Sequence, residues 1–139
     1  MAENNEVVVT ELDAVRLERL LHRGDREAVS REAGRPLNER LETARIVAGR
    51  QVAADVVTMN SLLRLVDLVS GEESEVRLVY PADLAAGPQR VSVLSPLGQV
   101  LLGARSGEVV AAALPGGGYR QYRVERLLFQ PEAAGIFDL

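Results

Sequence analysis

The stretch VSVLSPLGQVLLGARSGEVVAAALPGGGYRQYRVERLL, residues 91–128, decides the fold of this chain. The valine–serine alternation at 91–93 predicts a strand that stops before a proline. Ser95 is placed to cap a short helix, because Pro96 then takes the first helical position, where a backbone N–H is not needed. Gly103 is expected to end this helix. The apolar residues expected on its buried face are Leu97, Val100 and Leu101.

The second half of the same stretch predicts two strands joined by a glycine turn. An apolar run at 109–114 precedes PGGG, and 119–128 follows as a strand with Tyr122, Val124 and Leu127 available to a core. The glycine turn does not fit a phosphate-binding loop, because neither a helix nor a Lys-Ser/Thr pair follows it. The unit is therefore β-α-β-β, and nothing in it has the pattern of an active site.

The amino-acid composition excludes or disfavours several classes of function. The 139 residues are 47% hydrophobic, and the chain has no cysteine and one histidine, His22. Disulfides, thiol nucleophiles and zinc clusters are thereby excluded, and a histidine-based triad is disfavoured. The net charge of −4 argues against a basic nucleic-acid-binding face. No apolar run reaches the roughly 18 residues of a membrane span, and the acidic N-terminus does not fit a secretory signal. We expect a cytoplasmic protein with no membrane contact.

The N-terminal third predicts a helical hairpin. Thr10 and Asp13 have the spacing of a capping box, with Asp13 reaching back to the start of a helix over 12–22. The sequence Gly-Arg-Pro at 34–36 is expected to interrupt helix, and a further helix is expected over 36–48. Two such helices form a short antiparallel arm of roughly 18–20 Å.

The remainder predicts a small sheet. Alternating apolar residues at 63–69, a polar turn and a second strand at 75–80 form a hairpin. Together with residues 91–128, this gives an α+β fold, in which a short N-terminal antiparallel helical hairpin precedes an antiparallel sheet with one short helix.

Asp25 and Glu27 fall in the bend of the predicted hairpin, where two carboxylates could hold a cation. Each also fits a structural role, Asp25 as an N-cap and Glu27 as a first-turn acid, and we favour this interpretation. Ser95 has no plausible base nearby in the pattern, so it is interpreted as a cap and not as a nucleophile.

Five motifs carry a resemblance to a known family: DVVTMNS at 55–61, LVYPADL at 78–84, VSVLSPLGQVLLG at 91–103, LPGG at 114–117 and QPEAAG at 130–135. With these motifs the chain resembles the Gre-factor superfamily over residues 7–139, in its branch of regulators of nucleoside diphosphate kinase. The resemblance implies three parts: an N-terminal helical arm (1–50), a linker (51–60) and a C-terminal Gre-type, FKBP-like domain (61–139).

The resemblance also implies a function. We expect a non-enzymatic transcription regulator that binds RNA polymerase near its secondary channel and competes with Gre factors. It needs no cofactor, metal or catalytic residue, makes no sequence-specific nucleic-acid contact and is expected to be a monomer. The expected polymerase contacts are the arm tip, with Arg23, Asp25, Arg26 and Glu27, and a rim contact on the C-terminal domain, with Ser95, Pro96, Leu97 and Gly98.

Two alternatives stay open. In the first, Asp25 and Glu27 hold a metal and the protein stimulates transcript cleavage, although RGDREAV departs from the Gre tip pattern and the arm is short. In the second, the C-terminal domain is an FKBP-like isomerase or chaperone. Its pocket would need the aromatic residues Tyr80, Tyr119, Tyr122 or Phe129, and the low aromatic content of 4% counts against it.

Overall fold

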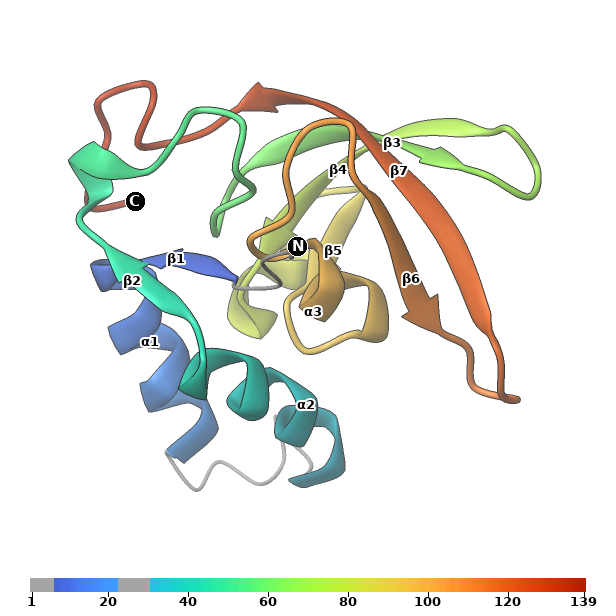
Figure 1. The fold of residues 1–139 in the computed structure, drawn as a ribbon, viewed down its shortest axis with the longest axis horizontal. Helices are drawn as coiled ribbons and strands as arrows, with labels where there is room; N and C mark the ends of the chain where they lie inside the picture. Colours follow the sequence, from blue (N-terminus) through green and yellow to red (C-terminus); the bar gives the residue numbers. More distant parts are fainter. Residues whose placement is uncertain (1–6, 23–30) are drawn as a thin grey trace, which may run out of the picture.

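A computed structural model describes residues 7–22 and 31–139. The N-terminal part contains β1 (Val8–Thr10), α1 (Glu11–His22), α2 (Arg31–Glu42) and β2 (Arg45–Val47). The rest contains η1 (Gly49–Gln51), β3 (Leu62–Asp67), β4 (Glu73–Val79), η2 (Pro81–Ala86), β5 (Arg90–Ser92), α3 (Pro96–Leu101), β6 (Val109–Ala113) and β7 (Tyr119–Phe129). The fold is α+β, with a helical hairpin beside a curled sheet (Figure 1).

The end of the helical hairpin differs from the prediction. The helix expected over 36–48 ends at Glu42, and the chain continues as β2, which pairs with β1 in parallel. The Arg45 N–H donates to the Val7 carbonyl at 2.8 Å at the start of this pair. The expected interruption at 34–36 is also absent, because α2 runs through these residues. Pairing with a distant strand thus overrides the local helical pattern.

The main sheet is mixed and not antiparallel as predicted. Its five strands lie in the order β5-β4-β3-β7-β6, and β4 pairs with β5 in parallel. The parallel pair arises because the segment that contains η2 returns the chain to the level of Arg77, so that β5 runs beside the last three residues of β4 in the same direction. Figure 1 shows the sheet curled, with α3 lying inside the curl near β6. The remaining pairs are antiparallel, including the two predicted hairpins.

A single buried cluster joins the helical hairpin to the sheet. Leu17 of α1 and Leu37 of α2 are fully buried, in the same cluster as Leu63, Leu78 and Leu101. Ala14, Leu20 and Leu21 of α1 also pack against this cluster. The division into an arm, a linker and a C-terminal domain stays a prediction. Within the predicted linker, the buried residues are Val56, Val57, Thr58 and Met59.

Candidate functional site

The predicted arm tip, with Arg23, Asp25, Arg26 and Glu27, lies outside the described residues. Its role therefore stays a prediction. The second predicted contact, Ser95–Gly98, is described in full and forms the start of α3.

The SPLG turn is held by a closed set of short hydrogen bonds. The Ser95 hydroxyl donates to the Ser92 carbonyl at 2.7 Å and accepts from the Gly98 N–H at 3.0 Å. Ser95 is thus the N-cap of α3, as predicted, and both its donor and acceptor are used by the backbone. Pro96 is exposed and Leu97 is half-buried, so these two side chains are the part of the turn that a partner can reach.

Gly98 fixes how closely α3 approaches the preceding strand. A Cβ at this position would lie 1.9 Å from the Ser92 carbonyl oxygen, which is inside van der Waals contact. The predicted apolar face of α3 is confirmed, because Leu101 is buried in the core and Leu97 and Val100 are half-buried and pack against it. Gly98 and Gln99 are buried as well, which the pattern of apolar residues did not predict.

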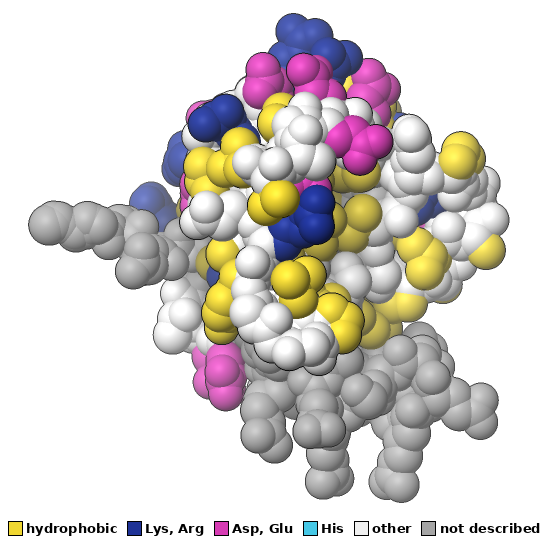
Figure 2. Space-filling view, turned by 90° about the vertical axis from the view of Figure 1, so that its right-hand side faces the viewer, with side chains coloured by type: hydrophobic (Ala, Val, Ile, Leu, Met, Phe, Trp, Pro, Cys, Tyr) yellow, Lys and Arg dark blue, Asp and Glu magenta, His cyan; other side chains and the backbone are white. Residues whose placement is uncertain are grey.

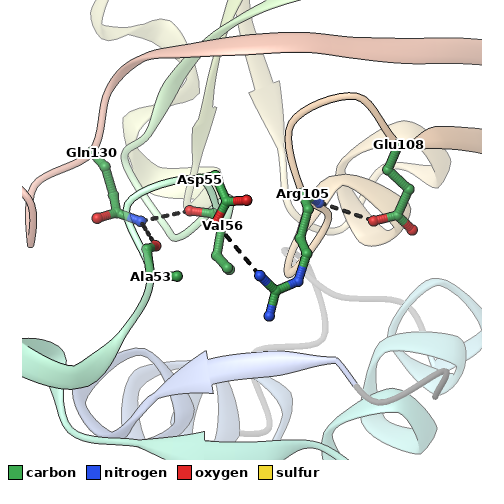
Figure 3. Close-up of polar contacts among 6 residues, drawn as sticks. All are labelled: Ala53, Asp55, Val56, Arg105, Glu108 and Gln130. Atoms are coloured by element: carbon green, nitrogen blue, oxygen red, sulfur yellow. Dashed lines mark hydrogen bonds and ion pairs between the residues drawn. The ribbon is translucent and has the colours of Figure 1, made fainter. Parts of the chain in front are cut away.

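Two of the motifs are clamped together by Gln130, as Figure 3 shows. Its side-chain amide donates to the Ala53 carbonyl at 2.8 Å and to the Val56 carbonyl at 2.7 Å. The side-chain oxygen of Gln130 accepts from the Ala133 N–H at 3.1 Å. Since Gln130 is only 4% exposed and Val56 is buried, these bonds satisfy the Gln130 amide and the Val56 carbonyl away from water. QPEAAG and DVVTMNS therefore serve the fold by joining segments that are distant in sequence.

The rim of this clamp carries an exposed polar cluster (Figure 3). Arg105 lies 3.5 Å from Asp55, with both side chains about half exposed. The Arg105 N–H donates to the Glu108 carboxylate at 2.9 Å, which closes the turn before β6. An exposed ion pair of this kind contributes little to stability. Its charges are thus available to a partner beside α3.

Asp13 takes part in the predicted cap and also makes a long-range contact. The Thr10 hydroxyl accepts from the Asp13 N–H at 3.2 Å, as expected of the cap, and the Thr10 side chain also interacts with the Asp13 carboxyl. The Asp13 carboxylate in addition accepts from the Met59 N–H at 3.1 Å and joins α1 to the segment before β3. Burial raises the pKa of Asp13 to about 6, and nearby Glu132 adds to the rise. This carboxylate is an anchor for the helical hairpin.

The aromatic residues that an isomerase pocket requires are spread over the molecule. Tyr119 is 72% exposed at the start of β7, and Tyr122 packs against the core. Phe129 lies opposite Leu62 on the outer face of the sheet, 5.5 Å from the Arg77 guanidinium. Tyr80 lies 3.5 Å from Asp13. The structure does not bring these four rings together.

Within residues 7–22 and 31–139, no three acidic or histidine side chains form a metal-binding group. In the same residues, the helices are too short or too polar to cross a bilayer.

The motifs therefore shape the C-terminal fold, and the fold can be compared with known proteins. Residues 52–127 match the family model for the C-terminal part of the GreA/GreB transcription elongation factors. The chain belongs to the GreA/GreB family. The resemblance predicted from the five motifs is confirmed.

Individual members of the GreA/GreB family agree with this assignment. The chain is 37% identical to the regulator of nucleoside diphosphate kinase of Escherichia coli K12, over 96% of both chains. It is 32% identical to the transcription inhibitor protein Gfh1 of Thermus thermophilus, over 70% of this chain and 66% of that relative. A solved GreA/GreB factor from Nitrosomonas europaea aligns over 89% of this chain and 100% of its own, with 33% identity and a TM-score of 0.72.

Sequence reasoning missed the roles of two buried polar residues in this GreA/GreB fold. Gln130 and Asp13 each bind backbone groups more than 45 residues away. For Gln130 a signal was available, namely its position between a predicted strand and a proline. A glutamine is buried at such a position only when its side-chain amide is hydrogen-bonded. For Asp13 the capping-box pattern supplied a sufficient local explanation, and it concealed the long-range bond.

Proposed function

We propose that this chain is a non-enzymatic transcription regulator that binds RNA polymerase near its secondary channel and competes there with Gre factors. Family membership supports the kind of partner, and the match to the E. coli regulator along nearly its whole length supports a regulatory role. The name of that relative supports a link to the regulation of nucleoside diphosphate kinase. The site of action is the cytoplasm, where the polymerase works.

The observation that carries the proposal is the short helical hairpin. α1 and α2 have 12 residues each, which is about 18 Å of helix. Leu17 and Leu37 bury this hairpin against the sheet, so its base is held rigidly beside the C-terminal fold. A short, rigid arm suits a protein that occupies the mouth of a channel and excludes longer competitors, and it is too short to deliver groups deep inside.

The same proposal assigns two contacts. Arg23, Asp25, Arg26 and Glu27 contact the channel from the tip of the arm. The SPLG turn contacts the rim through Pro96 and Leu97, whereas Ser95 and Gly98 hold the turn in shape. Pro96 projects from a capped helix start whose geometry is already fixed, so binding costs little ordering of the backbone. The FKBP-like description of the C-terminal fold is part of the same proposal.

The test is retention of the purified chain on core RNA polymerase, with displacement of bound GreA as a second readout. We expect wild type to be retained and to displace GreA. Pro96→Glu should weaken retention about tenfold, since a charge at the centre of an interface costs at least about 1.4 kcal/mol. Val69→Glu, which adds the same charge at a 74% exposed turn position, is the matched control and should bind as wild type does.

The outcomes separate the alternatives. Failure of wild type to bind polymerase would overturn the proposal. Equal weakening by Val69→Glu would remove the SPLG turn from the interface. The variant Asp25→Ala/Glu27→Ala is tested on a backtracked transcript. If wild type shortens that transcript and this variant binds without shortening it, the protein is a cleavage-stimulating factor and not a competitor.

A further inference from the structure

The outer face of the main sheet can be read from the strand registers. Leu63 pairs with Val76 and Leu127, and all three contribute to the core. Directly opposite residues on neighbouring strands point to the same face, and the next residue along each strand points to the other face. Arg64, which follows Leu63, therefore points outward together with its opposite residues, Glu75 and Arg126.

The outer face of the main sheet is rich in arginine. Arg123 lies opposite Val66, and Arg77 lies opposite both Leu62 and Arg90. The five arginines that the registers place outward, here called the arginine face, are Arg64, Arg77, Arg90, Arg123 and Arg126. They cross strands β5, β4, β3 and β7. In Figure 2, basic and acidic side chains lie together along the top of the molecule, away from the helical hairpin.

Three of these arginines are held within the protein. Arg64 lies 3.6 Å from Glu73 and 3.1 Å from Glu75. Arg77 donates to the Asn60 carbonyl at 2.8 Å, and Arg90 donates to the Asp83 carbonyl at 3.4 Å. Glu73 and Glu75, which the register places on this face, are thus used by the same arginine, and Glu125 is exposed at the β7 bulge between Arg123 and Arg126.

Arg123 and Arg126 differ from the other three. Both are exposed, and within the described residues neither makes a side-chain hydrogen bond or an ion pair. Arg126 also lies directly opposite Arg64, and like charges in this position destabilise a sheet. Glu73 and Glu75 offset the charge of Arg64, whereas Arg123 and Arg126 keep exposed guanidinium groups that the carboxylates of a partner can reach.

We propose that the arginine face binds an acidic segment of a partner protein, with Arg123 and Arg126 pairing with carboxylates on that segment. Guanidinium groups bind carboxylates through two parallel hydrogen bonds, which favours arginine at such contacts. A protein partner fits better than a nucleic acid, because Glu73 and Glu75 lie on the same face and the whole chain has a net charge of −4. This surface is separate from the SPLG turn and does not depend on polymerase binding.

The test uses a fluorescein-labelled poly-glutamate peptide and the full chain, with binding followed by fluorescence anisotropy at low salt. We expect Arg123→Ala/Arg126→Ala to weaken binding about tenfold, since both free guanidinium groups are lost. The matched control is Arg19→Ala/Arg45→Ala, which removes the same charge from two exposed arginines outside the face. It should bind nearly as wild type does. Both variants should keep the wild-type thermal midpoint, because the altered side chains are exposed.

Equal weakening by the two double variants would overturn the proposal, since binding would then follow net charge alone. Tighter binding of an oligo(dT) of equal formal charge would also overturn it, in favour of a nucleic-acid partner. If the alanine variant loses its fold, Arg123→Gln/Arg126→Gln tests the same contact with side chains of similar length. Retained poly-glutamate binding by a folded glutamine variant would contradict the proposal.

Discussion

At the scale of single residues, Asp13 shows how one position can serve two purposes. Its N–H completes the cap of α1, whereas its carboxylate, 3% exposed, accepts from the Met59 N–H. The hydrogen bond of the N–H stabilises the start of the helix, whereas that of the carboxylate holds the helix against a distant segment of the chain. Because burial disfavours the charged form, the pKa of Asp13 rises from 3.8 to about 6.

This pKa makes stability depend on pH in a defined direction. The native state binds the Asp13 proton more tightly than the unfolded state does, so the contribution of Asp13 to stability is fully present below pH 3.8. It is lost as the pH rises through about 6, and the difference amounts to about 3 kcal/mol. An asparagine side chain in its place cannot ionise. We therefore predict that the free energy of unfolding of wild type, relative to Asp13→Asn, falls by up to this amount between pH 4 and pH 7.

Urea unfolding of both proteins at a series of pH values measures this difference, and the other carboxyl groups cancel between them. A difference that stays constant with pH would show that Asp13 titrates in the native state as it does in the unfolded chain. Glu11→Gln is a suitable control, because it replaces a carboxylate that is exposed on the same helix.

At the scale of elements, the clamp made by Gln130 connects the end of β7 to the segment that leads into β3. The side-chain amide of Gln130 donates two hydrogen bonds of 2.7 and 2.8 Å across this connection, and its side-chain oxygen accepts a local one from the Ala133 N–H. The bonded positions Gln130 and Val56 are 74 residues apart. Neither segment has enough regular structure to hold its place alone.

We predict that Gln130→Ala lowers the free energy of unfolding by about 1–3 kcal/mol, because it leaves the buried Val56 carbonyl without its donor. Gln121→Ala, at an exposed position of β7, is the control and should change the free energy of unfolding by less than about 0.5 kcal/mol. Chemical denaturation of the three proteins provides the comparison. Similar values for the two variants would mean that water replaces the side chain at the clamp.

At the scale of the whole molecule, the helical hairpin and the sheet share one core. Leu17 and Leu37 belong to the cluster that also contains Leu63, Leu78 and Leu101. Small proteins with a single core unfold in one cooperative transition. The shared core therefore predicts that the three predicted parts, 1–50, 51–60 and 61–139, unfold together. An unfolding experiment can test this expectation.

We predict that Leu37→Ala lowers the free energy of unfolding of the entire chain by about 2–5 kcal/mol, because it leaves a cavity at the junction of hairpin and sheet. Far-ultraviolet circular dichroism reports on the helices, and tyrosine fluorescence reports on Tyr80, Tyr119 and Tyr122 in or beside the sheet. The two signals should shift together. Val15→Ala, at a half-exposed position of α1, should have a small effect. Loss of helical signal before the tyrosine signal would support an independent arm instead.

The sequence by itself determined the elements whose signals are local. Ser95, Pro96 and Gly103 define α3, because a cap, a proline and a glycine in the left-handed region act within one helical turn. Alternating apolar residues define β3 and β7, and the five motifs identified the family. The roles of the tip residues Asp25 and Glu27 stay predictions from the sequence.

Only the tertiary structure decided the features that depend on distant partners. β1 and β2 are strands because they pair with each other, and the parallel β4–β5 pair depends on the path of η2. The burial of Asp13 and the arginine face follow from packing and register. The physical reason is that the free energy of such contacts is gained only after segments far apart in the chain have met, so no local pattern of residues records it.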